Sequence, residues 1–315
     1  MGERLNQLWK SIARMRGARH WDDVTGRKMP PRVRWWDSQL IVQHVNENIC
    51  GEPLKTLGAA TPVLIKRRFP GRTFPKAVSI GCGTGFKEMM LIEARLVEEF
   101  DLFELSKARL EEGTKLANSR GLSERVKFHN RNGLAHAEPE RFDLVHWSNS
   151  LHHMIDVDEA VAWSRKVLKP NGVFFMDDFV GPDRMQWPDR MLKAASRVRV
   201  ALPERFLQNP YRANKALPRR VKRPHRLKML LTDPTECADS SRIIPAVMKW
   251  FPNAEIRPTG GAIYHLALND VLHNMDEVAD RDTIQKLLRI DDLCTARGDF
   301  HYAMALAEKT NPDVP

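Results

Sequence analysis

Residues 76–85 read KAVSIGCGTG, a short apolar run that ends in three alternating glycines. The apolar run predicts a buried strand, and the pattern of residues 86–94 predicts a helix directly after the glycines. Glycines between a strand and a helix let a ligand approach the backbone closely. The spacing is Gly-x-Gly-x-Gly, whereas a pyrophosphate-binding dinucleotide site normally shows Gly-x-Gly-x-x-Gly. By itself the loop therefore fits either a ligand site or a tight structural turn.

Strand-like runs alternate with helical patterns on the C-terminal side of this loop. The strand-like runs are residues 98–106, 125–130, 141–148 and 171–179, with helical patterns at 106–120 and 157–168. This alternation predicts an α/β fold with a doubly wound, Rossmann-like parallel sheet covered by helices on both faces. Ligands of such sheets bind beyond the carboxyl ends of the strands, so the candidate site residues are sought there.

Changes of pattern along the chain predict four segments. They are a helical N-terminal extension (1–72), the Rossmann-like core (73–182), a basic helical lid inserted into the sheet domain (183–245), and a C-terminal segment (246–315) that completes the core sheet. The last segment contains strand-like runs at 254–261 and 300–309 around a helical pattern at 276–297.

Composition excludes several classes of protein. The chain has 315 residues, 42% of them hydrophobic, which excludes a disordered tail or a disulfide miniprotein. It has no apolar run near the ~20 residues that cross a bilayer and begins without an apolar leader. Its four cysteines lie far apart, which fits reduced thiols better than a disulfide framework. We therefore expect a soluble, cytoplasmic protein without a membrane span.

The net charge of +10 is concentrated in one segment. Residues 183–228 contain 14 Lys and Arg against three acids. A solvated helical surface explains this excess most simply. An anionic substrate, a membrane surface or a nucleic acid is an alternative partner for the same segment.

The next strands add polar residues where a nucleoside would lie. Glu104 ends the second strand, 19 residues after Gly85, where a carboxylate can accept both hydroxyls of a ribose. Asn130 and Asn132 follow the third strand, and their amides could read an adenine edge. The fourth strand leads into residues 147–153, WSNSLHH, and residues 168–173, LKPNGV, form a turn that feeds the fifth.

In order, spacing and residue type, residues 76–179 resemble the class I S-adenosylmethionine-dependent methyltransferases. The family often has Asp after the third strand, where this chain has asparagines. The resemblance implies S-adenosyl-L-methionine as cofactor. It implies that Gly81, Gly83 and Gly85 line the cofactor, that Glu104 holds its ribose, and that Ser148 or Asn149 lies beside the sulfonium. A dehydrogenase would need a second substrate domain, which the sequence does not show.

Glu88 follows the glycine loop by three residues. A carboxylate near a helix N-terminus is stabilised by the helix dipole, which is the simpler interpretation. The alternative is that Glu88 meets the ammonium of the cofactor.

Candidate catalytic groups follow the fourth and fifth strands. His152 could act as a general base, although a histidine pair in this loop is often structural in the family. The pair lacks the third ligand and the spacing of a metal site, so no metal is expected. Asp177 and Asp178 point to opposite faces, so at most one faces the site cleanly. Glu204 is one of only three acids in the basic segment, and it either pairs with a neighbouring Arg or faces the pocket.

Candidate substrate-binding residues lie outside the core motifs. They are Trp35, Trp36, Trp187, Arg205, Tyr264 and His265. Trp187 could equally belong to the core, and Tyr264 and His265 could be a satisfied buried pair. Together with the motifs around them, these residues loosely resemble a bacterial subfamily of small-molecule methyltransferases that includes methionine S-methyltransferases.

The hypothesis for function is methyl transfer to a small molecule. The most specific acceptor is a thioether amino acid such as methionine, because a thioether sulfur is nucleophilic without a base. A sugar or other hydroxylated metabolite is the alternative and would need His152 or a carboxylate as base. Nucleic acid is less favoured, since residues 148–151 replace the Asn-Pro-Pro-Tyr signature of many base methyltransferases. A non-catalytic regulator fits the intact cofactor motifs poorly, and a homodimer is left open.

Overall fold

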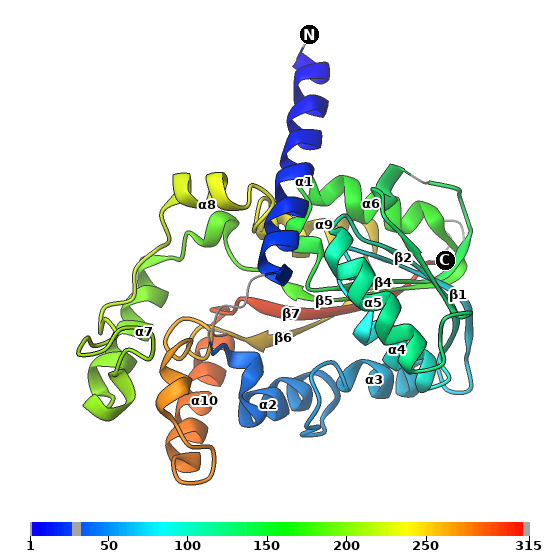
Figure 1. Cartoon of the computed structure of the whole chain (residues 1–315). Coiled ribbons are helices and arrows are strands. Elements are labelled where there is room, and N and C mark those ends of the chain that lie inside the picture. The colour runs from blue at the N-terminus through cyan, green and yellow to red at the C-terminus, as the bar shows by residue number, and fades with distance from the viewer. Residues whose placement is uncertain (1, 27–32, 136, 311–315) are drawn as a thin grey trace.

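The computed structural model describes residues 2–26, 33–135 and 137–310, with side chains from residue 7 onward. A seven-stranded sheet with the order β3-β2-β1-β4-β5-β7-β6 runs through the molecule (Figure 1). The strands are β1 (Phe74–Ile80), β2 (Val97–Phe103), β3 (Val126–His129), β4 (Phe142–Ser148), β5 (Leu168–Phe179), β6 (Glu255–Gly260) and β7 (Tyr302–Glu308). The first five are parallel, and β7 is antiparallel to both of its neighbours. The predicted doubly wound α/β fold is confirmed.

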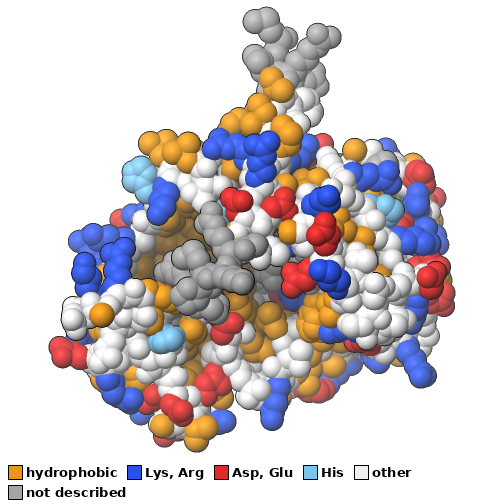
Figure 2. Space-filling model, viewed as in Figure 1, with side chains coloured by type: hydrophobic (Ala, Val, Ile, Leu, Met, Phe, Trp, Pro, Cys, Tyr) orange, Lys and Arg blue, Asp and Glu red, His pale blue; other side chains and the backbone are white. Residues whose placement is uncertain are grey.

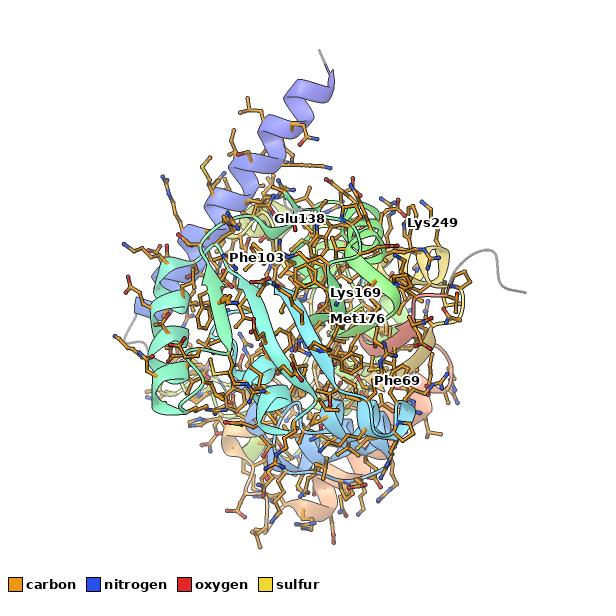
Figure 3. All side chains as sticks on the ribbon, turned by 90° about the vertical axis from the view of Figure 1, so that its right-hand side faces the viewer. Phe69, Phe103, Glu138, Lys169, Met176 and Lys249 are labelled. Carbon is orange, nitrogen blue, oxygen red and sulfur yellow. The ribbon has the colours of Figure 1, made fainter. Side chains whose placement is uncertain are left out.

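The central strands are apolar on both faces, as strands covered on both sides must be. Along β5, Val173 and Phe175 belong to one hydrophobic cluster, whereas Phe174 and Met176 belong to the other. Met176 lies in the interior among the side chains of the sheet (Figure 3). Because Ser148 of β4 pairs with Asp177 of β5, the carboxyl ends of these strands meet at one edge.

Helices cover the two faces of the sheet. On one face lie α2 (Gln39–Cys50), α3 (Ala60–Arg68), α4 (Phe86–Glu93) and α10 (Arg281–Thr295), and on the other α6 (Val157–Val167) packs against α9 (Ile243–Trp250) (Figure 1). Local sequence fixes several helix starts. The side chains of Ser38, Ser106 and Asp156 accept backbone N–H groups at the first turns of α2, α5 (Lys107–Ser119) and α6.

Two segments extend from this layered core. Helix α1 (Gly2–Gly26) projects from the body at its N-terminal end, and its C-terminal part lies against α5 (Figure 1). Residues 183–245 contain the helices α7 (Asp189–Ala201), α8 (Arg226–Thr232) and, at their end, the start of α9. Figure 2 shows Lys and Arg side chains on the surface of this region. None of the described helices is long and apolar enough to cross a membrane.

The turn after β6 is held by a buried carboxylate. Asp291 of α10 is 0% exposed and accepts N–H groups from Gly261 (2.9 Å) and Ile263 (2.5 Å). Gly260 has φ +100°, and a Cβ there would stand 2.0 Å from Oδ2 of Asp291, so only glycine fits. Burial raises the pKa of Asp291 to about 6, although the backbone N–H groups oppose this shift.

This raised pKa predicts a pH-dependent contribution to stability. The unfolded chain loses the Asp291 proton near pH 4 and the folded chain near pH 6, so the contribution is complete below pH 4 and falls as pH rises through 6. Asp291→Asn cannot titrate. At pH 4 we expect the variant to have a lower free energy of unfolding than the wild type. This difference should shrink by about 2 kcal/mol between pH 4 and pH 7. Urea unfolding of both proteins at the two pH values measures this, and an equal difference at both would contradict it.

Candidate active site

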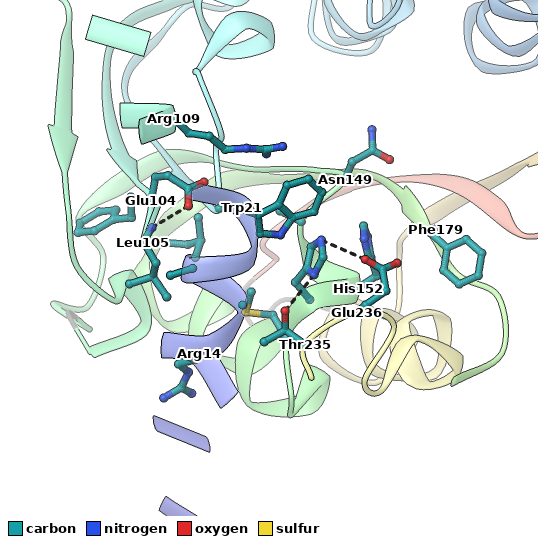
Figure 4. Close-up of a pocket in the computed structure, with 18 of the residues that line it drawn as sticks. Arg14, Trp21, Glu104, Leu105, Arg109, Asn149, His152, Phe179, Thr235 and Glu236 are labelled. Carbon is teal, nitrogen blue, oxygen red and sulfur yellow. Dashed lines mark hydrogen bonds and ion pairs between the residues drawn. The ribbon is translucent and has the colours of Figure 1, made fainter. Parts of the chain in front are cut away.

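A cavity of about 430 Å³ opens at the carboxyl ends of β1, β2, β4 and β5. Residues from the N-terminal helix, the core and the last strand share in lining it. Trp21 lies between Glu104 on one side and His152 and Glu236 on the other (Figure 4). The lining therefore joins the predicted cofactor motifs to residues that follow the fourth strand and to residues from distant segments.

Glu104 organises the end of the cavity next to the glycine loop. Its Oε2 accepts the N–H of Gly83 at 2.9 Å, and its Oε1 accepts those of Leu105 (2.7 Å) and Ser106 (2.8 Å). The residue is only 9% exposed, and its remaining surface faces the cavity. Gly81 has φ +67° and lines the same end.

Asp178 and His152 form a buried pair at the opposite end. Asp178 is 0% exposed, and its Oδ1 lies 2.5 Å from Nδ1 of His152, which lines the cavity. Burial by itself lowers the pKa of His152, but the charge and hydrogen bond of Asp178 outweigh it and raise the pKa to about 9. The imidazole is therefore held in one orientation with Nε2 on the side away from Asp178.

A second histidine and two residues from the predicted lid segment (183–245) adjoin this pair. His153 lies with Nδ1 3.2 Å from Oγ1 of Thr235 and Nε2 3.9 Å from Oε2 of Glu236. The edge of Trp21 meets the His153 ring at 5.7 Å between centroids. Burial and the neighbouring His152 charge hold the pKa of His153 well below its usual range.

Aromatic side chains enclose the cavity beyond these histidines. Trp35 donates through Nε1 to the hydroxyl of Tyr302 (3.2 Å), which lies 2.9 Å from Nδ1 of His265. Burial lowers the pKa of His265 to about 3, so this imidazole is neutral. Trp36 and Phe179 complete this mainly apolar wall, in which the polar atoms belong to indole, hydroxyl and imidazole groups.

The core of this chain matches a known family. Residues 78–174 match the family described as "Methyltransferase domain". The ubiquinone biosynthesis O-methyltransferase of Pasteurella multocida (strain Pm70) is 28% identical over 151 residues, which are 45% of this chain. The aligned part is 57% of that relative, so the chain spans little more than half of its length.

Two solved structures are similar to this chain at low identity. Phosphoethanolamine N-methyltransferase 2 of Haemonchus contortus in complex with S-adenosyl-L-methionine has a TM-score of 0.50 at 15% identity, covering 89% of this chain and 60% of that one. Geranyl diphosphate methyltransferase in complex with GPP and sinefungin has a TM-score of 0.49 at 13% identity, covering 82% and 80%.

Residues 78–174 are a methyltransferase domain. The resemblance and the cofactor predicted from the sequence are confirmed, since these residues match a methyltransferase domain. The geometry of the methyltransferase cavity fits such a ligand. Beside Gly81, the buried Ser150 has an Oγ with no hydrogen-bond partner, which is a free polar atom at the cofactor end.

The structure separates the predicted cofactor residues of the methyltransferase into two groups. Those that line the cavity are Gly81, Glu104, Asn132 and Asn149. Gly83, Gly85 and Asn130 shape the loop behind them: Asn130 donates to the carbonyl of Glu104 at 3.0 Å, and a Cβ at Gly85 would stand 2.8 Å from Leu102. Of the two asparagines, Asn132 lines the cavity and Asn130 does not.

Three predicted site residues lie beside the cavity without lining it. Glu88 is buried, accepts a hydrogen bond from Ser79 (2.8 Å) and lies 3.0 Å from His146. Burial favours a higher pKa for Glu88, but these two partners hold it below its usual range. Ser148 and Asp177 both face Lys87, whose Nζ donates to the Ser148 hydroxyl at 2.7 Å. Their polar groups therefore contact other side chains of the protein and do not line the cavity.

Four predicted acceptor or catalytic residues lie outside the lining of this cavity. The Glu204 side chain is 95% exposed, and Arg205 pairs with Asp280 at 2.5 Å. Trp187 packs on His301 at 4.5 Å between centroids, and the fully buried Tyr264 donates to the carbonyl of Thr259. Trp35, Trp36 and His265 do line the cavity.

Sequence reasoning missed the contribution of α1 and of residues 235–236. Arg14 and Trp21 of α1 line the cavity, and the guanidinium of Arg109 lies 4.0 Å from the centre of the Trp21 ring. A tryptophan followed by acids near the end of a helix was the available signal, but nothing local in the sequence ties it to the glycine loop. Glu236 comes close to the histidine pair only through the fold.

Replacing Glu104 tests the cofactor end. We expect Glu104→Gln to weaken binding of S-adenosyl-L-methionine by roughly 1.5–3 kcal/mol, because one acceptor of charge-assisted hydrogen bonds is lost. Calorimetric titration measures the dissociation constant. Glu99→Gln on the same strand is the matched control, since Glu99 pairs with Lys127 at the surface. If wild type and Glu104→Gln bind S-adenosyl-L-methionine with equal affinity, Glu104 does not contact the cofactor.

Proposed function

We propose that this protein transfers a methyl group from S-adenosyl-L-methionine to a hydroxyl oxygen of a small molecule. The observation that carries the proposal is the continuity of one cavity, which runs from the glycine loop to the His152–Asp178 pair. Cavities of several hundred Å³ lined by aromatic and a few polar groups are typical of small-molecule sites. Beyond the cofactor, the space that the aromatic wall encloses suits a small acceptor.

The residues at the cofactor end hold the donor. Glu104, Asn132, Asn149 and Ser150 offer the polar atoms, and Gly81 permits close approach of the backbone. When bound, S-adenosyl-L-methionine supplies an electrophilic methyl group. Trp21 and Arg14 cover this end from α1, so the N-terminal helix excludes water from it.

A hydroxyl acceptor must lose its proton as the new O–CH₃ bond forms. His152 lies at the acceptor end of the cavity and can take this proton in its neutral form, which its raised pKa of about 9 makes the major form only at alkaline pH, and Asp178 fixes the orientation of the imidazole. The relative from Pasteurella multocida, an O-methyltransferase, supports an oxygen acceptor.

A second candidate is methylation of a thioether such as methionine. The aromatic faces of Trp21, Trp36 and Phe179 favour it, because such faces stabilise a sulfonium product. This reaction needs no proton acceptor, so it leaves the His152–Asp178 pair without a chemical task. For that reason we place it second.

The cover of the cavity is part of the proposal. Met185, Thr235 and Glu236 bring residues 183–245 to the cavity, as a lid segment would. The division of the chain at 72, 182 and 245 and a homodimer stay predictions.

Assaying acceptors with methyl-labelled cofactor tests the proposed function. We expect transfer to a hydroxylated acceptor in a panel of phenols, catechols and sugars, with no S-methylmethionine from methionine. His152→Gln should lower kcat by about 100-fold or more and leave the affinity for the cofactor within a few-fold, because proton transfer is worth roughly 10²–10⁴ in rate. His44→Gln, which changes a histidine paired with Asp292, is the control. Formation of S-methylmethionine without an O-methylated product would establish the second candidate instead.

A further inference from the structure

The hydrogen bonds around His153 determine which of its nitrogens carries hydrogen. The hydroxyl of Thr235 donates its only hydrogen to Oδ1 of Asp233 at 2.6 Å. At its contact with His153 the same hydroxyl oxygen must therefore accept, so Nδ1 of His153, 3.2 Å away, is the protonated nitrogen. This leaves Nε2 as a bare acceptor, and it faces Oε2 of Glu236 at 3.9 Å. Two acceptors that face each other can share a cation or a hydrogen-bond donor between them.

His152 presents the same arrangement beside it. The carboxylate of Asp178 accepts the hydrogen of Nδ1, so a metal ion would bind His152 through Nε2 and displace the proton that the raised pKa of about 9 keeps there at neutral pH. One candidate ligand atom from each of His152, His153 and Glu236 lies within 4.8 Å of the others. All three residues line the cavity.

Each of these three side chains also contacts a second residue that fixes its orientation. Asp178 fixes His152, Thr235 fixes His153, and the thiol of Cys237 donates to Oε1 of Glu236 at 3.2 Å. Metal-binding histidines and carboxylates commonly have such outer partners, which set the tautomer and the direction of the ligand atom.

Three carboxylates lie at this cluster, and Arg184 is a cationic side chain that interacts with two of them, Asp233 and Glu236. The carboxylates of Asp178, Asp233 and Glu236 surround the two imidazoles, and all three contribute to the electrostatic environment of His152 or contact His153. Oδ2 of Asp233 is buried and has no hydrogen-bond partner.

We propose that His152, His153 and Glu236 bind a divalent transition-metal ion at the acceptor end of the cavity. Two imidazoles and one carboxylate suit Zn²⁺, Co²⁺, Mn²⁺ or Fe²⁺ and leave coordination positions free. Coordination bonds of about 2.0–2.2 Å require the ligand atoms to approach one another by about 1 Å, which side-chain rotation provides. Neither the family match nor the relatives described above assign a metal to these residues.

A metal at this place deepens the proposed function, on which this step rests. The acceptor hydroxyl would bind at a free coordination position, where the ion would lower its pKa and the proton would pass to solvent, so that His152 would serve as a ligand in place of accepting the proton itself. The oxygen then forms its bond to the methyl carbon as the bond from that carbon to the cofactor sulfur breaks. The products are the methylated acceptor, S-adenosylhomocysteine and one proton.

Titration of the untagged full chain with Co²⁺ tests the site without relying on activity. We expect one equivalent of Co²⁺ to bind and to produce visible absorption bands of a nitrogen- and oxygen-coordinated ion. His153→Ala and Glu236→Gln should each weaken this binding by about 100-fold or more. Asp178→Asn should weaken it about 10–100-fold. His225→Gln, at an exposed histidine, should bind like the wild type.

The outcomes separate this proposal from the proposed function. Calorimetry with S-adenosyl-L-methionine first shows that each variant is folded. Unchanged Co²⁺ affinity in both ligand variants, or no stoichiometric binding by the wild type, overturns the metal site; a proton on His152 then fills the cluster. Loss of O-methylation in chelator with recovery on adding metal supports it. If Co²⁺ binds at these residues but no hydroxyl in the panel is methylated, the metal site stands and the proposed function fails.

Discussion

A fully buried carboxylate, Asp178, determines how the two central strands meet at the cavity. Its oxygens accept N–H groups from Ser150 (2.8 Å), Leu151 (2.7 Å) and Phe179 (2.7 Å), as well as the contact with His152. An unpaired charge at this depth would cost several kcal/mol, so the loop after β4 must wrap around the end of β5 to supply these donors. The position of the histidine pair is a consequence of this wrapping.

The N-terminal helix depends on the same core although it comes from the far end of the sequence. Asp22 accepts the hydroxyl of Ser106 (2.7 Å) and the N–H of Ala108 (3.1 Å) at the start of α5. An acid at a helix N-terminus is favoured by the exposed N–H groups and the dipole. Nearer the N-terminus, Lys10 pairs with Asp156 and Glu159 at the start of α6. These contacts hold Trp21 over the cavity, so the cover is fastened to both sides of the sheet.

The alternation of strands and helices could be predicted from the sequence because it depends on local patterns, and so could Glu104, which is fixed by its distance from the glycine loop. The residues that complete the acceptor end could not, since Glu236 and Trp21 reach it through tertiary contacts alone. Glu204 shows the opposite error. An acid in a basic segment attracts attention in the sequence, yet its side chain is almost entirely in solvent.

The basic composition of residues 183–245 has a structural cause that the sequence alone does not suggest. Much of this segment lacks regular secondary structure, so many of its carbonyl groups have no partner in a helix or strand. Arginines supply the missing donors. Arg199 is buried and donates to the carbonyls of Ala267 (2.8 Å) and Pro218 (3.0 Å).

Other arginines of this segment also donate to backbone carbonyl groups. Arg219 donates to the carbonyl of Val200 at 2.8 Å, Arg223 to that of Trp187 at 2.8 Å, and Arg184 to that of Glu236 at 3.0 Å. A guanidinium carries five N–H donors and keeps its charge when partly buried, which makes Arg well suited to this task. Part of the positive charge of the segment is therefore needed to fold it. The contact of Arg184 with the backbone of Glu236 also links this requirement to the acceptor end, because it helps to place the carboxylate that faces His153.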